Sequence, residues 1–528
     1  MVAGAAGPAR LRGTAVGDQA SDAPEAPAES PASPGEAIGI DFELPVEAAA
    51  RLARLPALAA WRSGGARSSK ADRIWFDTAD GRLATEGLVV EKPARGPRLL
   101  VRTRPAASGP WHPGRPAEVL RSLSEDDLPA EAGGDTLAAI AAFAGRQQAF
   151  RLALSEGEVQ AVLLSGELRS VAAGGPAARL GLTGPVAAVV AAARAIAAEL
   201  PLLPQRAALA EEGRAIAANA PPRAPRLGAP DTSAAATAED AFVQAFGHLL
   251  EVVRQQSARI DPAAPPEPVH QTRVALRRLR SVFRVFRPVT DCAALRALDA
   301  RLREVLAVLG PARDWDVFLG GILAEIAAAF PEDRRIAGLR RAAEAERRAA
   351  YAAVATMLED PAWRLLTIDA LGTLLARPWR DGTEAERLTA LDAPVEAYGK
   401  AVLERRWHRL RRAGNGFEDL SAEALHELRL DGKRLRYAAE VFAPVFGAKA
   451  GRRFLKRVAA LQDGLGLAND AAVARGLAAR LMAPGNGGRA WAVGAVEGWC
   501  EARLAATRDS AFVAWGRLHG KDRFWSGD

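Results

Sequence analysis

The sequence predicts a multidomain protein of the α+β class, in which an antiparallel, barrel-like β domain precedes an all-α domain that is internally duplicated. Three observations lead to this fold class. After Gly39, apolar and polar residues alternate with a period of two, which is the pattern of strands. From residue 237 onward, long amphipathic segments rich in Ala, Leu and Arg are typical of helices. Two motifs within these segments recur at one constant spacing.

The first strand of the β domain is predicted where Ile40, Phe42 and Leu44 point to one side and the acidic residues between them to the other. Turn residues separate the later strand-like segments, as in antiparallel sheets. Strands are predicted at 73–76, 88–91, 99–102, 149–154 and 159–164, and helices at 46–55 and 186–199. We place this domain at 36–219, after a tail (1–35) whose composition predicts disorder.

The helical domain is predicted at 237–528, behind a Pro/Ala-rich linker at 220–236. Its charge differs from that of the preceding part. Residues 1–236 contain 25 basic and 26 acidic residues, whereas 237–528 contain 45 basic and 37 acidic ones. The net charge of +7 therefore resides in the helical domain, where it indicates a polyanionic partner.

Composition narrows the class of protein further. A hydrophobic share of 49% and a charged share of 25% exclude wholesale disorder. With only Cys292 and Cys500, neither a disulfide scaffold nor a cysteine zinc site is expected, and a reducing cytoplasm fits. No segment has the length and apolarity of a membrane span, and residues 1–22 lack the apolar core of a secretory signal. We therefore expect a cytoplasmic protein without a membrane partner.

The duplication is visible in two motifs. The segment from His270 to Arg280 (HQTRVALRRLR) recurs as HELRLDGKRLR from His426, 156 residues later. The segment GPARDWDV, which begins at Gly310, recurs as GLANDAAV from Gly466 at the same offset. Two motifs that share one offset predict a pair of helical subdomains related by a pseudo-twofold axis.

Each copy of the first motif places a row of cations on one face of a helix, opposite an apolar face that seats it in a bundle. Like charges one turn apart destabilise a helix by a few tenths of a kcal/mol per pair, so such a row indicates an anionic ligand. The alternative is a solvated face with salt-bridge partners on neighbouring helices. Metal binding is not expected, because no histidine or carboxylate follows on the same face. The predicted binding residues are His270, Arg273, Arg277, Arg278, Arg280, Arg284, His426, Arg429, Lys433, Arg434 and Arg436.

These motifs resemble those of the CHAD (conserved histidine α-helical domain) family. The resemblance covers essentially all of 237–528 through VHQTRVALRRLRSVFRVF, LGPARDWDVFL, LHELRLDGKRLRYAAEVFAPVFG and LQDGLGLANDAAVA. It implies two pseudo-symmetric bundles, a shared positive surface that binds inorganic polyphosphate, and an association with polyphosphate granules. One departure is Glu440, which stands where the first copy has Arg284. We therefore expect the second row to bind more weakly.

The preceding domain resembles the CYTH family, whose fold is a triphosphate tunnel, in GIDFELP, RIWFDTADGRLATEGLVV and ALAEEGRAI. Active members of that family carry E-x-E-x-K on the first strand, whereas this chain has Asp41, Glu43 and Pro45. The later acidic strands lack their carboxylates. The resemblance therefore implies a degenerate domain without catalytic residues. Asp41, Glu43 and Glu211 remain as candidate metal ligands, and Mg²⁺ or Mn²⁺ is expected only if the domain is active.

Two hypotheses for the function remain. The first is a non-catalytic polyphosphate-binding protein with the β domain as scaffold, and the second is a metal-dependent triphosphatase or polyphosphatase to which the helical domain delivers substrate. Metal-dependent release of phosphate from triphosphate would separate them. Nucleic-acid binding explains the charge equally well. We do not expect it, because the basic rows lack the aromatic residues of single-strand binders.

Overall fold

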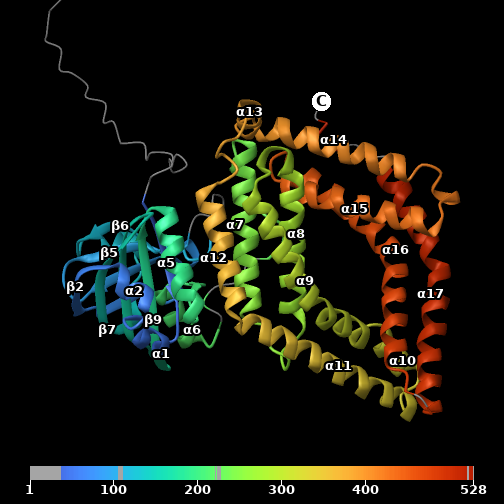
Figure 1. The fold of residues 1–528 in the computed structure, drawn as a ribbon, viewed down its shortest axis with the longest axis horizontal. Coiled ribbons are helices and arrows are strands. Elements are labelled where there is room, and N and C mark those ends of the chain that lie inside the picture. The colour runs from blue at the N-terminus through green and yellow to red at the C-terminus, as the bar shows by residue number, and fades with distance from the viewer. Residues whose placement is uncertain are drawn as a thin grey trace, which may run out of the picture. The chain divides into compact units, whose positions relative to one another are not determined.

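The structure is a computed structural model that describes residues 37–104, 111–220, 222, 227–483, 485–519 and 523–526. The tail predicted for 1–35 lies outside the described residues, as do 221 and 223–226 of the predicted linker. Residues 37–528 form one compact unit (Figure 1). Within the described part, none of the helices combines the length and the apolar character that a membrane crossing requires.

The N-terminal region contains one antiparallel sheet with short helices on it (Figure 1). Its strands are β1 (Ile38–Glu43), β2 (Arg62–Lys70), β3 (Arg73–Thr78), β4 (Leu88–Pro93), β5 (Arg98–Arg102), β6 (Glu118–Leu123), β7 (Leu137–Leu154), β8 (Gly157–Ser170), β9 (Gly174–Gly184) and β10 (Leu203–Pro204). Its helices are α1 (Val46–Leu52), α2 (Pro56–Trp61), α3 (Arg82–Glu86), α4 (Leu128–Glu131), α5 (Val186–Glu199) and α6 (Leu209–Ala218). The antiparallel class predicted from alternation is confirmed.

This sheet is not closed, which corrects the predicted barrel-like form. Its strand order is β10-β1-β9-β8-β7-β3-β4-β5-β6, with β2 paired to β7, and no pairing in the described residues joins β6 to β10. Closure requires the two end strands to pair, and residue alternation does not encode that contact. Strand β10 is also only two residues long and ends at Pro204, which has no backbone N–H to donate.

The predicted inner face of β1 is confirmed. Ile40 and Phe42 are 2% and 0% exposed, and they pack in one apolar cluster with the buried face of α5, including Val189 and Ile196. Helix α5 begins and ends at the predicted residues. On the opposite face of β1, Asp41 and Glu43 remain for polar contacts, as a period of two requires.

The helical region runs from residue 238 to residue 519 (Figure 1). Its helices are α7 (Ala238–Ser257), α8 (Glu267–Thr290), α9 (Ala293–Gly320), α10 (Ile322–Ala329), α11 (Arg334–Glu359), α12 (Pro361–Ala376), α13 (Ala385–Leu391), α14 (Val395–Ala413), α15 (Ala422–Phe442), α16 (Ala448–Arg480) and α17 (Gly487–His519), with a 3₁₀ turn, η1 (Phe417–Asp419). Pro288 and Pro311, which predict helix breaks, lie inside α8 and α9. The packing of these long helices outweighs the backbone hydrogen bond that each proline removes.

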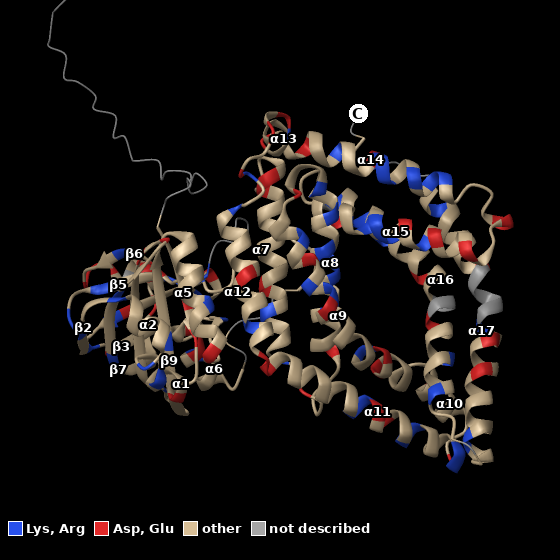
Figure 2. Ribbon diagram, in the orientation of Figure 1, with Lys and Arg blue, Asp and Glu red and all other residues tan. Residues whose placement is uncertain are grey.

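The duplication appears as two helix triplets at the same offset of 156 residues. Helices α7, α8 and α9 of the first copy correspond to α14, α15 and α16 of the second. The predicted apolar faces of α8 and α15 are buried and meet in an aromatic cluster, where the rings of Phe286 and Phe442 lie 5.7 Å apart. Because the two apolar faces pack inward, the cationic faces of α8 and α15 are directed away from this core (Figure 2).

Candidate anion-binding site

Both copies of the repeat contribute cations to one open pocket, which we call the central pocket. Its volume is about 570 Å³. Helix α8 supplies Arg273 and Arg277, and α15 supplies Arg429 and Lys433. The other charged or titratable residues that line it are His270, Arg313, Asp314, Glu325, Asp470, Cys500 and Arg503. Five of the eleven predicted binding residues therefore line a single pocket.

The electrostatics of the central pocket reflect crowded positive charge. Burial, together with Arg277 and Arg429, lowers the pKa of Lys433 to about 8, against a smaller opposing effect of Asp470. Burial and nearby cations, chiefly Arg313, likewise lower the pKa of His270. In both groups burial is the larger cause and the neighbouring cations add to it, so a bound anion would favour the protonated forms.

The second repeated motif supplies carboxylates to the same pocket. Asp314 and Asp470 occupy equivalent positions in the two copies, and both line the central pocket. Burial raises the pKa of Asp314, and Asp470 adds to this rise, while Arg273 and Arg313 oppose it. The two carboxylates therefore lie among the cations rather than forming a separate acidic surface. Arg313, directly before Asp314, belongs to the second motif but is not among the predicted binding residues.

Three predicted residues make ion pairs, two of them with a neighbouring helix, as in the salt-bridge alternative. Arg278 donates to both carboxylate oxygens of Glu440, at 2.7 and 3.1 Å. Arg436 donates to the same carboxylate at 3.0 Å. Arg280 donates to Asp299 of α9 at 2.7 and 3.3 Å. The pairs of Arg278 and Arg280 join helices, and all three pairs leave fewer donors for a ligand.

Glu440 therefore differs from its predicted role. From the sequence we expected it to face the incoming anion and weaken the second row. The residue is instead 6% exposed and lies between Arg278 of α8 and Arg436 of α15. It links the two copies of the repeat. The sequence could not predict this contact, because a helical wheel shows which face Glu440 occupies but not that α8 covers that face.

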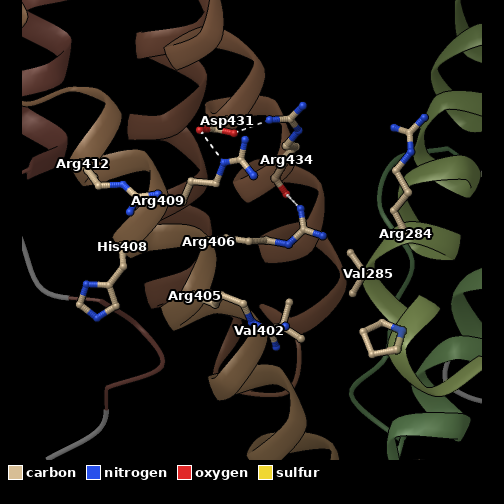
Figure 3. A pocket seen from close by; sticks show the side chains of 11 residues that line it. Arg284, Val285, Val402, Arg405, Arg406, His408, Arg409, Arg412, Asp431 and Arg434 are labelled. Carbon is tan, nitrogen blue, oxygen red and sulfur yellow. Dashed lines mark hydrogen bonds and ion pairs between the residues drawn. The ribbon is translucent and has the colours of Figure 1, made fainter.

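Arg284 and Arg434 line a different pocket, bounded by α8, α14 and α15 and about 790 Å³ in volume, which we call the α14 pocket (Figure 3). Four arginines of α14 share it: Arg405, Arg406, Arg409 and Arg412. They come from the sequence ERRWHRLRR, whose run of charge is visible in the sequence but belongs to neither repeated motif. His426, which heads the second row, is exposed and is not among the lining residues of either pocket.

The three acidic residues predicted as metal ligands have other partners. Asp41 accepts a hydrogen bond from Gln205 at 3.2 Å, and burial raises its pKa to about 6. Glu43 accepts from Arg206 at 3.0 Å and from the buried Arg254 of α7. The third, Glu211, accepts at 3.1 Å from the backbone of Ala208, at the start of α6.

Within the described residues, no three side chains of the His, Cys, Asp and Glu types gather as metal ligands. A divalent ion would have to displace the arginines from Glu43, and their charges oppose such an exchange. The donor set of the sheet region therefore does not fit a catalytic metal.

The helical region thus defines a class of protein: a duplicated helical-bundle domain that collects cations from both copies on one surface. Residues 236–479 match the model of the CHAD domain. The chain therefore contains a CHAD domain.

Solved structures give three further likenesses. The CHAD domain from the plant Ricinus communis shares 28% identity at a TM-score of 0.47, covering 57% of this chain and 96% of that one. PptA from Streptomyces chartreusis shares 17% identity at a TM-score of 0.40, with coverages of 53% and 100%. The Hippeastrum protein HpAC1, described as having a dominant triphosphatase activity, shares 16% identity at a TM-score of 0.19, with coverages of 28% and 79%. No curated protein matches the chain.

Proposed function

We propose that this protein binds inorganic polyphosphate in the central pocket without acting on it chemically. The observation that carries the proposal is the convergence of Arg273 and Arg277 from one copy with Arg429 and Lys433 from the other. Such a pocket suits a long anion with regularly spaced charges, because guanidinium groups bind phosphate oxygens through two donors at once. Association with polyphosphate granules in the cytoplasm belongs to the same proposal.

The sheet region serves as a scaffold in this proposal. Its remaining carboxylates are occupied by arginine, amide and backbone donors. Metal-assisted phosphoryl hydrolysis needs carboxylates that hold the metal and cations that hold the phosphates. Here the same carboxylates are paired with the donors instead. Metal-dependent release of phosphate from triphosphate by the full chain would favour the enzyme hypothesis instead.

Polyphosphate binding is tested by changing Arg273→Gln and Arg277→Gln together in the full chain. We expect the affinity for long-chain polyphosphate to fall by about 100-fold, because each charge-assisted hydrogen bond contributes about 1.5–3 kcal/mol. Titration calorimetry at two salt concentrations measures this loss, and the salt dependence should become shallower. The matched control is Arg340→Gln with Arg341→Gln on the exposed face of α11. Equal losses in both double variants would contradict a site in the central pocket.

Affinity should also depend on pH through Lys433. Its pKa is lowered to about 8 in the free protein, mainly by burial and then by Arg277 and Arg429. A bound polyanion favours the protonated amine and raises this pKa, so the contribution of Lys433 is complete below pH 8 and is lost as the pH rises above it. Calorimetric titrations between pH 7 and about 9.5 should show the decline. In Lys433→Arg the decline should be much smaller, and an unchanged profile would exclude Lys433 as its source.

A further inference from the structure

The four arginines of α14 that line the α14 pocket have no cationic equivalents in the first copy of the repeat. At the offset of 156 residues, Arg405, Arg406 and Arg409 of α14 correspond to Leu249, Leu250 and Val253 of α7. Those three apolar residues are buried, at 0%, 4% and 5% exposure. The cations of α14 are therefore specific to the second copy, and the repeated fold does not require them.

The contact between α8 and α15 differs in the same way between the two sets of equivalent residues. Arg278 meets Glu440 in an ion pair of 2.7 Å. The equivalent residues are Arg434 and Arg284, so two cations occupy the related positions. Arg284 has its pKa lowered by burial and by surrounding cations, among them Arg434. Arg278 and Glu440 thus join α8 and α15 through opposite charges, whereas Arg284 and Arg434 carry like charges and line an open pocket.

Six arginines line the α14 pocket, and the acidic residue among its lining side chains is Asp431. Asp431 pairs with Arg409 at 3.0 Å and with Arg434 at 2.5 Å, which holds these two guanidinium groups on one wall. Arg406 donates to the backbone carbonyl of Arg434 at 2.9 Å and extends into the gap between the walls (Figure 3). Burial and the neighbouring Arg405 and Arg434 lower the pKa of Arg406 to about 10.

We infer that the α14 pocket is a second anion site, distinct from the central pocket, that binds the oligophosphate group of a small ligand. Arg405, Arg409 and Arg412 follow one another along α14 over about 10 Å, so they match several linked phosphates better than a single one. Arg284 faces them from α8, so that cations lie on both sides of the pocket. Val285, Pro288 and Val402 give the pocket an apolar part as well. The oligophosphate could belong to a free condensed phosphate or to a nucleoside triphosphate, whose base the apolar part would contact.

The test uses the full chain with Arg273→Gln and Arg277→Gln, in which the central pocket is weakened. In this background, titration with tripolyphosphate should still show binding. Adding Arg284→Gln and Arg405→Gln should reduce that affinity by at least about tenfold, since each substitution removes a charge-assisted donor. The matched control adds Arg287→Gln and Arg411→Gln, which lie on the same two helices but are not among the lining residues.

Three outcomes decide the proposal. Loss of tripolyphosphate binding in the α14-pocket variant, with retention in the control, supports it. Equal loss in both variants, or no tripolyphosphate binding once the central pocket is weakened, overturns it. A parallel titration with ATP identifies the source: tighter binding than tripolyphosphate indicates a nucleotide site, and weaker binding indicates a condensed-phosphate site. Polyphosphate binding in the central pocket is measured separately, so either proposal can fail alone.

Discussion

Replacing Glu440 by arginine is expected to destabilise the helical region by about 3–5 kcal/mol, which is the usual effect of removing one partner from a buried ion pair. In the native protein, Glu440 is 6% exposed and accepts from Arg278 and Arg436. The variant would place a third guanidinium group beside these two, with no carboxylate to neutralise them. Urea denaturation followed by circular dichroism measures the loss. From the repeat alone, the same substitution would be expected to extend the second cationic row and strengthen polyphosphate binding.

The repeat supplies a matched control. Arg284→Glu makes the exchange at the equivalent position of the first copy, where it would place a carboxylate near the exposed Arg434. We expect this variant to unfold within about 0.5 kcal/mol of the native protein, as exposed substitutions usually do. Glu440→Arg with native stability would show that the contact with Arg278 and Arg436 contributes little to folding.

The features that could be predicted from sequence are those that depend on periodicity. Alternation identified the strand around Ile40 and Phe42, and the helical repeat identified the buried faces of α8 and α15. The constant offset predicted a pair of helical subdomains, and the resemblance to the CHAD family implied a positive surface that both share. The central pocket contains Arg273 and Lys433 from different copies. These properties follow from which face of an element must be buried.

The features that could not be predicted depend on which element covers a given face. Arg280 lies in the predicted cationic row, but its partner Asp299 comes from the next helix. Closure of the sheet likewise depends on a contact between its end strands, which the alternation of β1 does not encode. Arg254 was not selected from the sequence at all, because a single arginine in an amphipathic helix gives no sign that it is buried against a carboxylate of the sheet.

Arg254 connects the helical region to the sheet, and its replacement by methionine is expected to destabilise the protein by about 3–5 kcal/mol at neutral pH. The side chain is 2% exposed. Its guanidinium group donates to the carboxylate of Glu43 on β1 and, at 3.0 Å, to the backbone carbonyl of Pro204 on β10. Methionine fills a similar volume but leaves both acceptors without this donor. Glu43 would keep Arg206 as its remaining ion-pair partner.

The loss should depend on pH in a defined direction. Burial by itself raises the pKa of Glu43, but Arg254, Arg206 and Arg179 together hold it below the ordinary value of 4.5. The charged carboxylate therefore stabilises the native fold above pH 4.5, and this contribution is lost as the pH falls through the lower pKa of the folded state. In Arg254→Met, Glu43 stays buried but lacks its main cationic partner, so its charged form destabilises the fold. Protonation of Glu43 removes this destabilisation. The difference in unfolding free energy should narrow as the pH falls below 4.5.

A double-mutant cycle with Glu43→Gln separates the ion pair from the packing of the arginine stem. If the charge of Glu43 causes the loss, Glu43→Gln with Arg254→Met should be more stable at neutral pH than Arg254→Met alone, and its stability should vary less with pH. Arg254→Lys keeps a cation but not the two-donor geometry, and we expect it to fall between the native protein and Arg254→Met. A loss that is the same at pH 4 and at pH 7, and that Glu43→Gln does not reduce, would assign the effect to packing instead of charge.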